Sequence, residues 1–256
     1  MSDRTGASDS PEIADSTWNA ASEALDRAHD IGRRIQVWLR DDDCVAVTPA
    51  LDRLTALCTA AGMPILLAVI PQPAEPGLAD WIAAHPAVTP CQHGVAHRNH
   101  AAPGERACEL GGARPPDAVR DELVRGRAKL KALFGAHLSD ILVPPWNRID
   151  ADIVSFLPGL GFSALSTFGP TPEGDAGIRR LDSNLDIIDW RHGRVGRPLD
   201  DLSRKLAGLV ERQNTVGILT HHLAHDATAW AALEEMLGRL RAHPAVQFTE
   251  AAALLG

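Results

Sequence analysis

Histidines are concentrated in two short segments of this 256-residue chain. Six of its 11 histidines lie there: His93, His97 and His100 within eight residues, and His221, His222 and His225 within five. Neutral imidazole is a good zinc ligand and also titrates near neutrality. The two segments are therefore candidates for a metal site or for acid/base catalysis.

A third polar segment is the run of three aspartates from Asp41 to Asp43, which directly follows Arg40. Such a run by itself also fits a solvated turn or an acidic helix start, with Arg40 as an ordinary ion-pair partner. His93 and His97 stand at i and i+4, which lets both reach one metal ion if the segment is helical, yet this spacing alone is a weak signal. The joint placement of the segments carries the prediction.

Each polar segment follows a predicted strand. The strands expected ahead of them are Ile35–Leu39, Ala87–Cys91, Ile141–Val143 and Thr215–Thr220, and further strands are expected at Pro64–Ile70, Phe162–Leu165, Ile187–Trp190 and Val246–Phe248. The periodicity of apolar residues predicts helices between them, over 17–30, 49–61, 78–85, 117–134, 150–157, 199–211 and 228–243. The alternation of strand and helix, about seven times without an internal repeat, favours a parallel (β/α) barrel over an open sheet. Because the carboxyl ends of barrel strands meet on one face, distant residues can share one pocket.

The organisation predicted for the chain is a mobile N-terminal tail over 1–16 and a single barrel domain over 17–256. Inside that domain, 98–116 contains three glycines and three prolines and is expected to be a long functional loop.

Composition excludes several classes of protein. The net charge of −8 disfavours general nucleic-acid binding. The longest apolar runs are far shorter than the about 20 residues of a membrane-spanning helix, and the Ser- and Asp-rich start lacks the pattern of a signal peptide, so a cytoplasmic protein is expected. The four cysteines form no C-x-x-C pair and are expected to be reduced core residues.

The order of the motifs resembles the polysaccharide deacetylase family, the NodB-homology domain of carbohydrate esterase family four. In that family a strand ending in T-F-D-D-G is followed by H-[ST]-x-x-x-H, R-P-P-[YW], a D-W motif and L-x-H. The corresponding segments here are Arg40 to Cys44, His93 to His97, Val143 to Trp146, Asp189-Trp190 and Leu219 to His221. They span most of the chain.

This resemblance implies a distorted (β/α) barrel of about seven parallel strands with one divalent metal ion, zinc in the first place and cobalt, manganese, nickel or iron as alternatives. It implies that Asp43, His93 and His97 are the metal ligands, that Asp42 is the general base and that His221 is the general acid.

A second register of the aspartates stays open, with Asp42 as the ligand and Asp41 as the base. The small Cys44 in place of the family's glycine favours the first register, whereas counting back from Thr48-Pro49 favours the second.

The resemblance also implies neighbours of the reacting groups. Pro145, Trp146 and Asn147 are expected to bind substrate. Arg40, Asp189, Trp190 and His222 are expected to surround the catalytic residues, with Asp189 orienting His221.

Val143 stands where the family has an arginine that orients the base, and Arg40 or Arg148 are candidates to replace it. We therefore predict a metal-dependent hydrolase that removes an N-acyl group, most simply acetyl, from a sugar, an oligosaccharide or a related small polar molecule. The alternatives are hydrolysis of a different C–N bond and a weakly active or inactive barrel that binds a metal or a carbohydrate. No nucleic-acid or membrane partner is expected.

Overall fold

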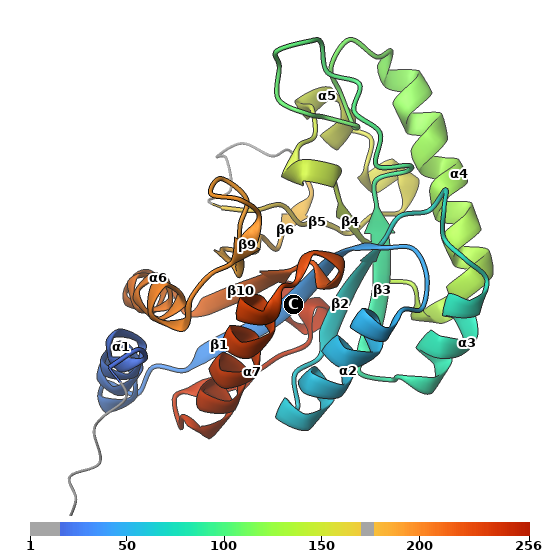
Figure 1. Ribbon diagram of the computed structural model, residues 1–256. Helices are drawn as coiled ribbons and strands as arrows, with labels where there is room; N and C mark the ends of the chain where they lie inside the picture. Colours follow the sequence, from blue (N-terminus) through green and yellow to red (C-terminus); the bar gives the residue numbers. More distant parts are fainter. Residues whose placement is uncertain (1–15, 170–176) are drawn as a thin grey trace, which may run out of the picture.

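Parallel strands dominate the computed structural model, which describes residues 16–169 and 177–256. The strands form one curled sheet with helices on its outside, and the C-terminus lies inside the curl (Figure 1). The predicted tail over 1–16 falls almost entirely outside the described residues.

The sheet contains nine strands. Its order is β6-β5-β4-β3-β2-β1-β10-β7, with β11 also paired to β1, and every pairing in it is parallel. The strands are β1 (Ile35–Cys44), β2 (Ile65–Val69), β3 (Val88–His93), β4 (Ile141–Val143), β5 (Ala164–Leu165), β6 (Arg179–Arg180), β7 (Leu185–Asp186), β10 (Thr215–Thr220) and β11 (Val246–Phe248). A separate antiparallel pair consists of β8 (Ile188–Asp189) and β9 (Val195–Gly196).

Seven α-helices connect or precede these strands within the described residues. They are α1 (Asn19–Asp30), α2 (Pro49–Ala61), α3 (Gly77–Ala84), α4 (Pro116–Phe134), α5 (Ala151–Val154), α6 (Leu199–Arg212) and α7 (Ala227–Ala242). Short 3₁₀ turns are η1 (Gly135–His137), η2 (Pro145–Asn147), η3 (Pro158–Leu160), η4 (His222–Ala224) and η5 (Ala251–Leu255). Local sequence explains the start of α2, where the Thr48 side chain accepts a hydrogen bond from the Leu51 N–H and Pro49 occupies the first helical position.

The structure confirms the predicted distorted (β/α) barrel. Its main sheet has nine strands rather than about seven, and the order ends at β6 and β7, so the barrel is curled rather than regular. The predicted strand over 187–190 is wrong in detail: β7 pairs with β10, and β8 leaves the sheet to pair with β9. The predicted helix over 150–157 is shorter than expected, because its α-helical part ends at Val154 and a Pro-containing 3₁₀ turn follows.

The two faces of the sheet pack different cores. The outer face contributes Val37 and Leu39 to a large cluster shared with the surrounding helices. The inner face contributes Trp38 and Val143 to a smaller cluster that Ala251 of η5 joins, so the C-terminal turn fills the inside of the barrel. All four cysteines are buried free thiols, as predicted.

Candidate metal and active site

Strand β1 distributes its three aspartates over different directions. Because side chains alternate along a strand, Arg40 and Asp42 share the inner face with Trp38, and Asp41 shares the outer face with Leu39. The pairing of β1 with β2 shifts register between Asp41 and Cys44, and Asp43 has a left-handed backbone with φ of 72°. This bulge removes Asp43 from the alternation that would otherwise place it beside Asp41.

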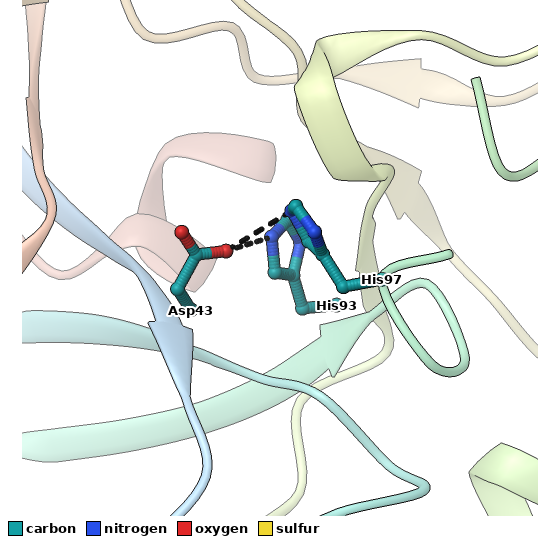
Figure 2. Close-up of side chains that lie close together, drawn as sticks. All are labelled: Asp43, His93 and His97. Atoms are coloured by element: carbon teal, nitrogen blue, oxygen red, sulfur yellow. Dashed lines mark hydrogen bonds and ion pairs between the residues drawn. The ribbon is translucent and has the colours of Figure 1, made fainter. Parts of the chain in front are cut away.

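Asp43 faces two histidines (Figure 2). Its Oδ1 lies 3.1 Å from His93 Nε2 and 3.2 Å from His97 Nε2. One ligand atom from each of the three residues lies within 4.8 Å of the others. His93 ends β3, two strands from β1 in the sheet, and His97 follows it in the connecting loop. The three residues that the resemblance implies as ligands therefore meet in space.

The protonation of this cluster suits a cation. Burial would raise the pKa of Asp43, but the hydrogen bond and charge of His93 outweigh it and hold the pKa of Asp43 well below its usual range. His93 Nδ1 lies 3.0 Å from the Val143 carbonyl, which can only accept, so Nδ1 is a donor. Nε2 is the other ring nitrogen and donates to Asp43 in the metal-free protein; it would have to lose this proton to ligate an ion. One carboxylate and two imidazoles form a donor set that zinc and similar divalent ions accept, with coordination positions left over. The residues present fit such an ion.

Asp42 lies on the inner face and is 2% exposed. Arg40, which is fully buried, places Nε 2.9 Å from Asp42 Oδ1 and donates from Nη2 to Asp42 Oδ2 at 3.0 Å. The remaining contacts of the guanidinium are Asn147 Oδ1 at 2.6 Å, Ser166 Oγ at 2.8 Å and the Thr167 carbonyl at 3.1 Å. Arg40 therefore occupies the place beside the inner aspartate that Val143 cannot fill. Arg148, the other candidate, instead donates to the Ala107 carbonyl.

His221 follows β10 and approaches the same aspartate. Its Nε2 lies 3.9 Å from Asp42 Oδ2, and its ring meets the Trp190 ring edge-on at 4.7 Å between centroids. The predicted contact with Asp189 does not occur. Asp189 instead interacts with Arg197 and His192, because the split of the predicted strand turns β8 away from β10.

Asp186 of β7 is a further acid whose charge interacts with His221, in addition to Asp42 and Asp43. It accepts a hydrogen bond from Trp190 Nε1 at 2.9 Å. Burial raises the pKa of Asp186 above its usual value. His221 Nδ1 is buried without a hydrogen-bond partner among the described residues, so Asp186 influences His221 through space.

Asp41 and His222 form a separate buried pair on the outer face. His222 Nδ1 lies 2.5 Å from Asp41 Oδ2, while the His222 N–H and the Thr220 hydroxyl donate to Asp41 Oδ1 at 2.9 and 2.6 Å. These contacts lower the pKa of Asp41 against the effect of burial and raise that of His222. His222 was expected near the catalytic groups, but it instead anchors the segment that carries His221 to β1.

The turn after β4 carries the residues expected to bind substrate. Trp146 and Asn147 both have left-handed backbones, with φ of 53° and 57°. This turn sets the Trp146 ring against His97 at 4.3 Å between centroids and brings Asn147 to Arg40. Pro145 is buried, and a Cβ at Gly94 would lie 2.4 Å from its Cδ. Its buried position supports the turn, and its expected contact with substrate stays a prediction.

Glu109 and Asp186 were not singled out from the sequence. Glu109 is 1% exposed and accepts hydrogen bonds from the backbone between the two candidate histidine ligands and just beyond them. The only signal for Glu109 was its place in the long loop over 98–116. Asp186 gave no signal, because it precedes the strand expected at 187–190.

Comparison with known proteins finds matches among solved structures but none among protein-family models or curated sequences. No protein-family model and no curated protein matches the sequence. Among solved structures, a protein from Mycobacterium smegmatis described as a polysaccharide deacetylase superimposes with a TM-score of 0.67 at 18% identity, covering 88% of this chain and 90% of its own. The chain has the fold of the family 4 carbohydrate esterases.

Other structures with this carbohydrate esterase fold differ in activity. A family 4 acetyl xylan esterase from Clostridium thermocellum, solved with a cobalt ion, matches with a TM-score of 0.58 at 14% identity over 86% of this chain and 89% of its own. A family 4 pseudoenzyme from Bacillus anthracis matches with a TM-score of 0.56 at 13% identity over 81% of this chain and 60% of its own. The carbohydrate esterase fold therefore does not by itself establish activity.

No described helix of the protein is long and apolar enough to cross a membrane. The cytoplasmic location stays a prediction.

Proposed function

We propose that the protein is a divalent-metal-dependent hydrolase that removes an N-acyl group, most simply acetyl, from a sugar or a related polar molecule. The observation that carries the proposal is the convergence of Asp43, His93 and His97 within 4.8 Å beside the buried Asp42. Zinc is the first candidate for the metal, and cobalt, manganese, nickel and iron fit the same donor set.

When bound, a divalent ion supplies Lewis-acid chemistry, because it polarises a carbonyl oxygen and makes water more acidic. In the proposed reaction Asp42 takes the proton from the attacking water. Arg40 donates a hydrogen bond to Asp42 Oδ2 and lies in ion-pair contact with Oδ1, which restricts the orientation of the carboxylate. The resulting geometry keeps the base on the inner face, next to Asp43, the proposed ligand that follows it on the same strand.

His221 is the proposed proton donor to the leaving amine. Its Nε2 lies 3.9 Å from Asp42 Oδ2, so base and acid are close enough to serve one scissile bond. The Trp190 ring packs on the imidazole and restricts its orientation. Asp41, the base in the second register, lies on the outer face in its pair with His222, which supports the first register.

An inactive barrel is the second candidate function, because Val143 replaces the family's arginine and family 4 pseudoenzymes share the fold. Arg40 argues against it, since the inner aspartate keeps a guanidinium at 2.9 Å.

Acetate release from N-acetylglucosamine and its oligomers tests the proposal. The protein is stripped with a chelator and reloaded with Zn²⁺ or Co²⁺. Activity should require the metal and should fall by at least about 100-fold in His221→Ala, the usual contribution of a positioned proton donor, with metal content unchanged. The exposed His137 supplies a control, and His137→Ala should keep full activity. A metal-loaded protein that releases no acetate from these sugars would favour the binding barrel.

A further inference from the structure

Glu109 is a carboxylate buried behind the candidate metal site. Among the described residues, its carboxylate oxygens accept hydrogen bonds from backbone N–H groups rather than from an arginine or lysine side chain. Val95 donates to Oε2 at 2.9 Å, and Ala96 and Arg98 donate to Oε1 at 2.8 and 3.0 Å. A buried charge requires such partners, so this carboxylate and this loop backbone are mutually dependent.

Residues 99–108 lead away from the loop that contains His97 and return to it, which places Glu109 beside the backbone of that loop. Asn99 Oδ1 accepts the Cys108 N–H at 3.0 Å, and the His100 N–H donates to the Cys108 carbonyl at 2.8 Å. On the far side of Glu109, Leu110 forms a β-bridge with Ile149. Glu109 is therefore anchored on both sides, through Cys108 to the residues that follow Arg98 and through Leu110 to Ile149.

Between the bonded N–H groups lies His97, whose φ of 54° is left-handed. A residue with a side chain adopts that conformation at a cost of about 1–2 kcal/mol. The neighbours of His97 on both sides donate to the same oxygen of Glu109. The carboxylate thus holds His97 in a conformation that the free chain would not prefer, and in that conformation Nε2 lies 3.2 Å from Asp43.

We infer that Glu109 is a positioning residue for the metal: it preorganises His97 and thereby sets the affinity of the Asp43–His93–His97 site for a divalent ion. This inference rests on the metal site of the proposed function. It goes beyond that function because it makes Glu109, which is not one of the proposed metal ligands, a determinant of the affinity for the metal.

Glutamine at position 109 is a sharp perturbation because it keeps the size of the side chain. The glutamine amide retains one carbonyl oxygen that can accept hydrogen bonds. Its NH₂ group would replace the other carboxylate oxygen and would face a backbone N–H, which cannot accept a hydrogen bond. Either the bond from Val95 or the two bonds on both sides of His97 are lost. The bonds that remain go to a neutral oxygen and are weaker than bonds to a carboxylate, so the left-handed turn at His97 is held less firmly. Loss of such supporting contacts typically weakens metal binding by about 10- to 100-fold.

Gly94 provides an independent way to disturb the same contact. Its φ is 52°, and a Cβ added there would lie 2.2 Å from Glu109 Oε2 and 2.4 Å from Pro145 Cδ. Gly94→Ala therefore crowds both the Glu109 carboxylate and Pro145 without changing any charge.

The test is a titration of the metal-free full-length protein with Co²⁺, followed by calorimetry and by the visible absorption of the bound ion, which reports its ligand geometry. We expect Glu109→Gln to weaken Co²⁺ binding by about 10- to 100-fold and to alter the absorption bands. Gly94→Ala should change both in the same direction. Glu105→Gln alters an exposed acid in the segment 99–108, and its Co²⁺ affinity and absorption should match those of the unmodified protein.

Co²⁺ affinity of Glu109→Gln within twofold of the unmodified protein, with the same spectrum, would overturn the inference while leaving the proposed function intact. Failure of the unmodified protein to bind Co²⁺ would overturn both. If circular dichroism shows that Glu109→Gln does not fold, Glu109→Asp, which keeps the charge but shortens the side chain, decides by the same twofold criterion.

Discussion

Replacing Arg40 with methionine removes the guanidinium that faces Asp42 inside the barrel. Arg40 is fully buried and Asp42 is 2% exposed, so water cannot replace the lost partner. Removing one member of a buried ion pair typically costs 3–5 kcal/mol, because the other charge stays buried without compensation. The hydrogen bonds to Asn147, Ser166 and Thr167 are lost as well. We therefore expect Arg40→Met to lower the free energy of unfolding by at least about 3–5 kcal/mol.

Urea denaturation of metal-free protein, followed by circular dichroism, measures this loss without any substrate. The informative comparison is a double-mutant cycle with Asp42→Asn. Because the amide carries no charge, Arg40→Met with Asp42→Asn should be more stable than the sum of the two single changes predicts, by at least about 2 kcal/mol. Arg40→Lys keeps a charge but cannot contact both carboxylate oxygens, and it should fall between methionine and arginine.

Two results would refute this reasoning. A loss below about 1 kcal/mol in Arg40→Met would mean that the pair contributes no more than a surface ion pair. Additive effects in the cycle would mean that Arg40 supports the fold through its other contacts and not through Asp42.

Three further predictions concern the other polar groups. Asp43→Asn should lose divalent metal measured by calorimetry, whereas Asp42→Asn should keep it; the reverse pattern would establish the second register. Asp41→Ala leaves His222 buried without its carboxylate and should lower the free energy of unfolding in urea by about 3–5 kcal/mol, and a loss below about 1 kcal/mol would contradict the role of that pair. Burial lowers the pKa of His225 to about 4, against about 6.5 in an unfolded chain. The unfolded state therefore binds this proton first as the pH falls, and His225 should contribute a loss of about 1.4 kcal/mol per pH unit between pH 6.5 and 4. His225→Phe should have a shallower dependence of stability on pH over that interval, and an equal slope would contradict the assignment.

The meeting of the candidate ligands could be predicted from sequence because it follows from topology. Asp43 and His93 lie at the carboxyl ends of β1 and β3, and parallel strands in one sheet bring such ends to the same edge. His97 needed only the short spacing to His93. These relations depend on strand order and chain length, which the hydrophobic pattern reveals.

The residues that were missed or misplaced depend on local backbone geometry, which that pattern does not reveal. The D-W motif of the resemblance pairs Asp189 with His221. The structure instead divides the segment into two short strands with different partners and puts Asp186 near His221. Glu109 accepts hydrogen bonds from backbone N–H groups of a loop. Such a loop leaves no periodic pattern in the sequence, so the contact could not be predicted. The choice of Arg40 over Arg148 depended on which side chain reaches across the inside of the barrel.

The three consecutive aspartates show how one strand end can hold three acids, two of them buried, without mutual repulsion destabilising it. Alternation sends Asp41 outward to His222 and Asp42 inward to Arg40. The left-handed backbone at Asp43 then turns the third carboxylate toward His93 at the end of β3, two strands away, and toward His97 in the loop that follows. Each acid thus has its own cationic or metal-ligating partner, so the roles are not interchangeable although the residues are identical. Removing one of the three carboxylates should therefore lower stability, metal affinity or proton transfer, and which of these is lost depends on which aspartate is replaced.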